Sequence, residues 1–174
     1  DNDGNKALRL IPFASDGNEP DMWAPMGSAL QHYRKQLSDF RHEAFLVPDP
    51  ARVAEFREKL AKLPGKKVGV CWRSMMLEAK RAKYFSPIDG WAPVLKTEGV
   101  SFINLQYGDC AAEIARAAQE HGITIHQIEG LDLRDDIDGT AALAAALDLV
   151  LSAPTAAAAT AASVGTEVWF LAAG

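Results

Sequence analysis

Short apolar segments that alternate with helical stretches constrain the fold of this chain most strongly. Five such segments occur, at 67–72, 100–105, 123–127, 147–151 and 167–171. Continuous apolar runs of this length are typical of strands buried on both faces of a parallel sheet. Their alternation with helices of about ten residues is typical of βαβ units. We therefore predict an α/β fold, with a Rossmann-like parallel sheet and flanking helices, over residues 66–174.

The order of the strands in this sheet follows from the handedness of the connections. Parallel strands are joined by right-handed crossovers, which leaves few topologies. If the first three strands wind one way and the fourth returns beside the first, the order is 3-2-1-4-5. The winding direction then reverses between strands one and four, where ligands of such sheets bind. The loops 73–86 and 152–155 are expected to meet there.

Residues 1–65 read as a helical lead-in, the remnant of a preceding lobe, with a domain boundary before residue 66. Apolar residues spaced by three and four predict a helix over 21–37, after a short strand at 7–11. Asp49-Pro50 can cap a second helix, which Pro64-Gly65 would end.

Bulk properties exclude several functions. The formal net charge of −5 argues against a dedicated binder of nucleic acid or of an anionic membrane. No apolar run reaches the roughly 18–20 residues of a membrane span. Cys71 and Cys110 lack metal-ligand spacing and are expected to be reduced thiols in the cytoplasm. Both ends look cut, so a fragment of a longer protein is expected.

The turn Ser152-Ala153-Pro154-Thr155 stands between a strand and an alanine-rich helix over 156–164, with Gly165 at its end. The helix dipole and the unpaired N–H groups of its first turn favour an anion, so a phosphate could bind at Pro154, Thr155 and Ala156. Any α/β crossover produces such a turn, and that ordinary explanation stays open.

The loop after the first strand concentrates positive charge. It carries Arg73, Ser74, Lys80, Arg81 and Lys83. Arginine and lysine suit diphosphates, through paired hydrogen bonds and point charge respectively. An anionic ligand or a solvated basic loop would explain this pattern, and the position at the switch point favours the ligand.

Two further turns offer polar groups. After the second strand, Gln106 and Tyr107 could contact a base or a ribose, while Gly108 and Asp109 could form a turn and a helix cap. A turn with a cap is at least as good an interpretation. After the third strand four aspartates crowd one loop, namely Asp132, Asp135, Asp136 and Asp138. Their spacing matches no standard calcium loop, so a helix cap and a solvated face are expected there, and no metal.

The usual catalytic signatures are missing. Trp72-Arg73-Ser74 follows the first strand where a dinucleotide dehydrogenase would carry its glycine motif. We found no P-loop, no HExxH helix and no nucleophile elbow with an ordered triad. No catalytic base stands out.

Several of these segments together resemble a known group of proteins. They are Lys67–Ser74, Val100–Asp109, Leu131-Asp132-Leu133 with Asp135-Asp136, and Ala146–Thr155, preceded by Val47–Val53. In this combination they resemble the glycosyltransferase-like C-terminal region found behind tetratricopeptide repeats in bacterial proteins. That region is distantly similar to the heptosyltransferases of lipopolysaccharide synthesis. The resemblance covers about residues 45–171.

The resemblance implies a GT-B architecture, in which two Rossmann-like lobes enclose a cleft and the C-terminal lobe binds the nucleotide-sugar donor. It matches Arg73, Ser74 and Lys80, with Arg81 beside them, to the basic loop that faces the donor phosphates. It matches Gln106 and Tyr107 to the turn near the nucleotide. Pro154, Thr155 and Ala156 match the small-residue turn that meets the diphosphate or sugar. The aspartate, glycine and histidine of the heptosyltransferase turn are absent here, which leaves the donor type and the activity open.

The sequence thus leads to a donor-binding lobe of a metal-independent glycosyltransferase, with a nucleotide sugar as substrate and no cofactor. The acceptor lobe is expected in the remainder of a longer chain, so this segment alone should be inactive. A non-catalytic interaction module that kept the fold is the alternative, and a sugar-nucleotide epimerase is a third reading.

Overall fold

The computed structural model describes residues 25–40, 43–75 and 85–171. The chain forms two compact units, one ending at His42 and one beginning at Glu43. The first unit contains helix α1 (Met26–Tyr33) and the 3-10 turn η2 (Leu37–Asp39). The helix predicted over 21–37 is thus present as the shorter α1, since Arg34 has left helical backbone angles. Residues 21–24 and the predicted strand at 7–11 lie outside the described ranges.

The second unit is built on a five-stranded parallel sheet in the order β3-β2-β1-β4-β5. Its strands are β1 (Lys66–Cys71), β2 (Val100–Asn104), β3 (Ile125–His126), β4 (Leu149–Ser152) and β5 (Val168–Phe170). This confirms the predicted α/β fold and its strand order. β3 is shorter than the predicted 123–127, because it pairs with β2 only at Phe102↔Ile125 and Ile103↔His126.

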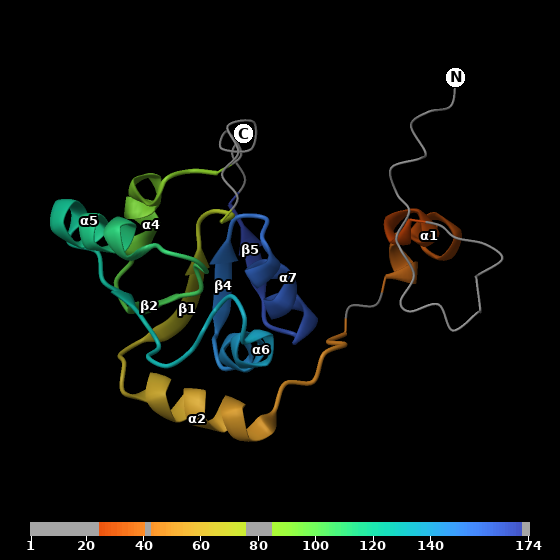
Figure 1. Ribbon diagram of the computed structural model, residues 1–174, viewed down its shortest axis with the longest axis horizontal. Coiled ribbons are helices and arrows are strands. Elements are labelled where there is room, and N and C mark those ends of the chain that lie inside the picture. The colour runs from red at the N-terminus through yellow and green to blue at the C-terminus, as the bar shows by residue number, and fades with distance from the viewer. Residues whose placement is uncertain (1–24, 41–42, 76–84, 172–174) are drawn as a thin grey trace, which may run out of the picture. The chain divides into compact units, whose positions relative to one another are not determined.

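Helices cover both faces of the sheet (Figure 1). One layer consists of α2 (Pro50–Ala61), α6 (Ile137–Ala145) and α7 (Ala156–Ser163). The other consists of the 3-10 turn η3 (Ile88–Trp91) with α4 (Ala92–Leu95) and α5 (Ala111–His121). Successive side chains of β1 and the residue after it point to opposite faces of the sheet. Val68, Val70 and Trp72 pack on the α5 side, and Cys71 packs on the α6 side. An apolar segment of this kind can therefore be buried on both faces.

Short polar side chains start two of these helices. Asp49 accepts a hydrogen bond from the Ala51 amide at 2.8 Å, and Pro50 takes the first helical position of α2. Asp136 accepts one from the Gly139 amide at 2.9 Å. α6 therefore begins at Ile137, directly after this aspartate, in agreement with the helix cap expected there.

The sequence placed a domain boundary after residue 65, and this stays a prediction. In the structure α2 packs against α6 within the second unit. The alanine-rich helix α7 ends as expected, with Gly165 following at a φ of +87°. None of the helices in the described ranges has both the length and the apolar character that crossing a bilayer requires.

Candidate functional site

The candidate site lies at the carboxyl edge of the sheet, where the winding direction reverses between β1 and β4. The segment after β1, the turn after β2 and the turn after β4 converge there. Direct contacts join them, because the thiol of Cys71 lies 3.6 Å from Oε1 of Gln106 and 3.4 Å from Oγ1 of Thr155. The end of β1 thus contacts the turn after β4, while the meeting of the loops 73–86 and 152–155 themselves stays a prediction.

Gln106 ties β1 to β2. Its side-chain oxygen accepts hydrogen bonds from the backbone amides of Trp72 at 3.1 Å and Arg73 at 3.0 Å. Its side-chain amide donates to the Tyr107 carbonyl at 3.1 Å. The residue is only 1% exposed, so its side chain holds the edge of the sheet together from inside. Of the two residues predicted to contact a base or a ribose, Tyr107 is the more accessible, since it is half-buried.

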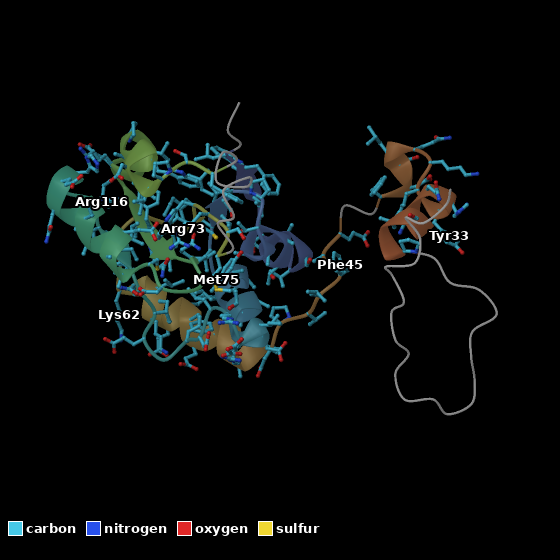
Figure 2. The ribbon with its side chains drawn as sticks, turned by 45° about the horizontal axis from the view of Figure 1, so that its top comes forward. Tyr33, Phe45, Lys62, Arg73, Met75 and Arg116 are labelled. Carbon is cyan, nitrogen blue, oxygen red and sulfur yellow. The ribbon has the colours of Figure 1, made fainter. Side chains whose placement is uncertain are left out.

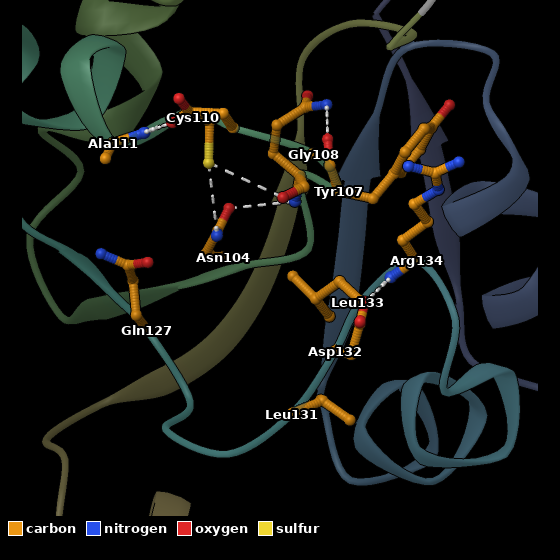
Figure 3. Close-up of a pocket in the computed structure, with 12 residues that line it drawn as sticks. Asn104, Tyr107, Gly108, Cys110, Ala111, Gln127, Leu131, Asp132, Leu133 and Arg134 are labelled. Atoms are coloured by element: carbon orange, nitrogen blue, oxygen red, sulfur yellow. Dashed lines mark hydrogen bonds between the residues drawn. The ribbon is translucent and has the colours of Figure 1, made fainter.

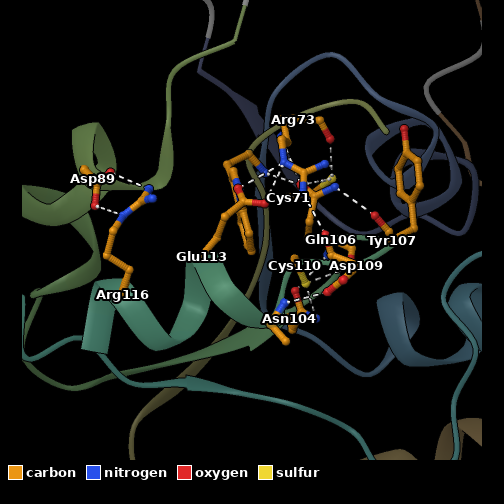
Figure 4. Close-up of polar contacts among 12 residues, drawn as sticks. Cys71, Arg73, Asp89, Asn104, Gln106, Tyr107, Asp109, Cys110, Glu113 and Arg116 are labelled. Atoms are coloured by element: carbon orange, nitrogen blue, oxygen red, sulfur yellow. Dashed lines mark hydrogen bonds and ion pairs between the residues drawn. The ribbon is translucent and has the colours of Figure 1, made fainter. Parts of the chain in front are cut away.

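The Arg73 guanidinium is enclosed by Glu113 of α5 (Figure 4). Nε of Arg73 lies 3.0 Å from both carboxylate oxygens, Nη2 also contacts Oε1, and Nη2 donates to the Asp109 carbonyl at 3.0 Å. The side chain of Arg73 is 14% exposed, whereas that of Arg116 on the same helix as Glu113 is 45% exposed (Figure 2). The positive charge of Arg73 is thus matched inside the protein.

Glu113 serves two donors at once. Besides Arg73, the indole N–H of Trp72 donates to its Oε2 at 2.7 Å. Burial raises the pKa of Glu113, but the hydrogen bonds from Arg73 and Trp72 outweigh it, so the pKa lies below its usual range. Glu113 is therefore a carboxylate at neutral pH, and it fixes the first residues after β1.

The turn after β4 has a polar interior and an exposed surface. Oγ1 of Thr155 lies 3.1 Å from Oγ of Ser152, and the Thr155 side chain makes no capping hydrogen bond to α7. Pro154 and Ala156 are exposed beside this uncapped helix start. A helix start whose N-cap side chain makes no capping bond is a position that favours an anion.

A pocket of about 370 Å³ opens between the turn after β2 and the loop after β3 (Figure 3). Tyr107 and Gly108 contribute one wall, and Leu131, Leu133 and Arg134 contribute the other. The volume falls in the range of about 300–1,000 Å³ that small-molecule sites occupy. Gly108 has a φ of +78°, and a Cβ there would come within 3.2 Å of Met75, so the turn needs glycine.

Aspartate side chains hold the loop that forms the second wall in shape, through hydrogen bonds and an ion pair. Oδ1 of Asp132 accepts hydrogen bonds from the amides of Arg134 at 2.8 Å and Asp135 at 3.0 Å. At the end of the loop Asp136 pairs with Arg52 of α2, with Nη1 to Oδ1 at 2.9 Å. Arg52 and the Gly139 amide lower the pKa of Asp136 to about 2. The aspartates thus shape the loop and cap a helix, as the sequence favoured.

One group in the described part of the chain has the composition of metal ligands. Asp89, Glu120 and His121 each offer an atom within 4.8 Å of the others. Asp89 is already paired with Arg116 at 2.7 Å, and this hydrogen bond lowers the pKa of Asp89. The group lies between η3 and α5, apart from the residues of the pocket, and we assign no metal to it.

The structure brings together only part of the predicted site. Arg73, Gln106, Tyr107 and Thr155 converge, and Ser74 lies beside Arg73 in the chain. Lys80 and Arg81 lie outside the described residues. The sequence missed Glu113, Leu131, Leu133 and Arg134. The rule that ligands meet the carboxyl ends of parallel strands could have indicated the last three, which follow β3.

These features define a class: an open, parallel α/β lobe of Rossmann-like type with a pocket at the carboxyl edge of its sheet. No protein family model matches the chain. The chain is 47% identical over 168 residues to protein FlbA of Caulobacter vibrioides, which covers 95% of this chain and 28% of that protein. The chain thus spans a little over a quarter of the length of the curated relative that it matches.

A solved structure has a similar fold. The crystal structure of a glycosyl transferase family 9 protein from Veillonella parvula matches with a TM-score of 0.54 over 81% of this chain and 40% of that one. The sequence identity is 9%, so the likeness concerns the fold. The fold of the second unit is therefore glycosyltransferase-like, as the resemblance implied.

Proposed function

We propose that this chain is the donor-binding lobe of a metal-independent glycosyltransferase with GT-B architecture, and that its ligand is a nucleotide sugar. The observation that carries the proposal is the pocket between the turn after β2 and the loop after β3, on a sheet whose fold is shared with a glycosyl transferase family 9 protein. Fold similarity alone does not determine a function, so the position and chemistry of the pocket bear the argument.

The two parts of such a donor have complementary surroundings at this edge. A base and ribose need an apolar slot with an aromatic side chain, which Tyr107, Leu131 and Leu133 supply. A diphosphate needs N–H donors, and the uncapped start of α7 after Thr155 offers them. In this proposal the dipole of α7 stabilises the negative charge that the departing nucleoside diphosphate develops.

The catalytic base and the acceptor belong, in this proposal, to other parts of a longer protein with tetratricopeptide repeats. FlbA, at more than three times the length of the matched segment, is consistent with a longer chain around this unit. Transfer to an acceptor is then an activity of the whole protein, and binding of the donor is what this segment can be tested for.

A second candidate, a non-catalytic interaction module with the same fold, is favoured by one observation. Two residues expected at the donor, Arg73 and Gln106, use their polar groups inside the protein. Such a module would keep the sheet and the pocket outline without binding any nucleotide.

The deciding experiment is a thermal-shift panel on this chain with UDP, GDP, ADP and CDP and their common sugar conjugates. A ligand at a hundred times its Kd adds about 2.7 kcal/mol to the free energy of unfolding. Tyr107→Ala, at the pocket, should weaken the shift. Tyr33→Ala, which makes the same change on α1 in the first unit, should leave the shift unchanged.

Stabilisation by one nucleotide that Tyr107→Ala reduces and Tyr33→Ala does not would support the donor lobe and identify the base. No stabilisation by any member of the panel, in this chain and in the full-length protein, would overturn the proposal in favour of the interaction module.

A further inference from the structure

A ligand with a diphosphate requires positive charge near the pocket, and Arg73 does not supply it freely. Its Nε and Nη2 are occupied by Glu113 and by the Asp109 carbonyl. To bind a phosphate with the fork formed by Nε and Nη2, Arg73 would have to leave a half-buried carboxylate without its partner, which is unfavourable. Another cation at the pocket is therefore better placed to meet the anion.

Arg134 has the opposite surroundings. Its backbone amide is held by Asp132 at 2.8 Å, so the residue is anchored at the pocket wall while its side chain stays 61% exposed. The guanidinium has one ionic neighbour among the described residues, Asp135, whose Oδ1 lies 3.7 Å from Nε. A pair of that separation between exposed side chains is weak and exchanges readily for a stronger partner.

The charges that line the pocket also single out Arg134. Asp109 and Asp132 contribute negative charge, and both carboxylates accept hydrogen bonds from backbone amides, at Ala111 and at Arg134 and Asp135. Among the described residues that line the pocket, Arg134 alone carries a positive charge. Arg134 and Tyr107 both line this pocket (Figure 3).

We propose that Arg134, rather than Arg73, binds the anionic group of the ligand in this pocket, and that this group is the diphosphate of a nucleoside diphosphate. The inference rests on the proposed function, and it names the residue that selects for the phosphates. A guanidinium presents a planar fork of donors that matches two phosphate oxygens at once, which a lysine ammonium does not. The Tyr107 ring, which lines the same pocket, is then available for the base or ribose of the same ligand.

The test compares charged and uncharged ligands on matched variants of this chain. Calorimetry would measure the Kd of the stabilising nucleoside diphosphate, of the corresponding nucleoside and of inorganic pyrophosphate. Arg134→Ala removes the guanidinium, and Arg134→Lys keeps the charge but loses the fork. Arg57→Ala makes the same change in charge on α2, where the side chain is exposed and lines no pocket described here.

We expect Arg134→Ala to raise the Kd of the nucleoside diphosphate by about 10- to 100-fold, which is the effect of losing a hydrogen-bonded charge. The Kd of Arg134→Lys should lie between those of the wild type and Arg134→Ala, and the Kd of Arg57→Ala should equal that of the wild type. The nucleoside, which has no phosphate, should bind all four proteins equally. Circular dichroism would confirm that Arg134→Ala is folded.

Three results would overturn the inference. If Arg134→Ala binds the diphosphate as the wild type does, the inference fails and the proposed function stands. If Arg134→Ala weakens binding of the nucleoside as much as binding of the diphosphate, Arg134 shapes the pocket and does not bind the anion. If the wild type binds neither nucleotide nor nucleoside, the proposed function and this inference fail together.

Discussion

The carboxylate of Glu113 on α5 holds the guanidinium of Arg73 at the end of β1, with Nε 3.0 Å from both carboxylate oxygens. The same carboxylate accepts the indole N–H of Trp72 at 2.7 Å. One side chain of α5 thus fixes two consecutive residues that leave the sheet beside the pocket. The contact is part of the folded framework.

Replacement of Arg73 by alanine should therefore destabilise the protein in the absence of ligand. Glu113 would keep a half-buried carboxylate without its cation, and we expect a loss of about 2 kcal/mol in the free energy of unfolding. Urea denaturation followed by circular dichroism measures it. Arg116→Ala breaks the more exposed pair with Asp89 and should lose clearly less, because solvent screens an exposed ion pair. Equal losses in the two variants would show that the enclosure of Arg73 contributes nothing.

The pair between Arg52 and Asp136 should make stability depend on pH in acid. Arg52 and the Gly139 amide lower the pKa of Asp136 from 3.8 to about 2. A carboxyl group whose pKa is lower in the folded state stabilises the protein above its unfolded pKa. That contribution is lost as the pH falls from about 4 to about 2, because the folded state must then also take up the proton.

Asp136→Asn tests this sign. The wild type should be more stable than the variant at neutral pH, and the difference should shrink as the pH falls through this window. Asp138→Asn, on the exposed first turn of the same helix, controls for loss of a nearby charge. Chemical denaturation at a series of pH values measures the difference. A difference that stays constant down to the lowest pH would contradict the role of this pair.

The sheet could be predicted from the sequence because its signals are local. Apolar segments such as 67–72 and 100–105 mark strands buried on both faces, and the right-handed crossover rule limits how they are ordered. Asp49-Pro50 likewise predicts the start of α2 from two adjacent residues. The observed order β3-β2-β1-β4-β5 follows from these two kinds of information.

The partners of individual side chains at the site could not be predicted in this way. Glu113 is 40 residues from Arg73 and has the sequence context of an ordinary charged helix residue. Only the packing of α5 on the sheet brings the two together, so Arg73 looked like a free cation. Arg134 stands among aspartates, which suggested a solvated loop. Asp132 instead folds that loop against the pocket.

Gly69 in the middle of β1 should resist enlargement. A Cβ there would lie 2.5 Å from Cδ1 of Leu105 and 2.7 Å from Cδ1 of Leu147. Gly69→Ala therefore forces two core side chains to move, and we expect a loss of about 2 kcal/mol. The double variant Gly69→Ala with Leu105→Val relieves one of the two overlaps. It should be less destabilised than the sum of the single changes, because the two residues share one space. Strictly additive losses, measured by urea denaturation, would place the strain elsewhere.

The thiols of Cys71 and Cys110 should not react with thiol reagents in the folded protein. Cys71 is 0% exposed and Cys110 is 5% exposed. Burial raises the pKa of both thiols, so little thiolate is present at neutral pH. Reaction with a chromogenic disulfide reagent then requires opening of the structure, and its rate should rise with urea in parallel with unfolding. Cys110→Ala isolates Cys71, whose Sγ lies in the contact between β1 and Thr155. A fast reaction of that variant in native buffer would show that the end of β1 opens on its own, and that the junction at the switch point is not a fixed part of the fold.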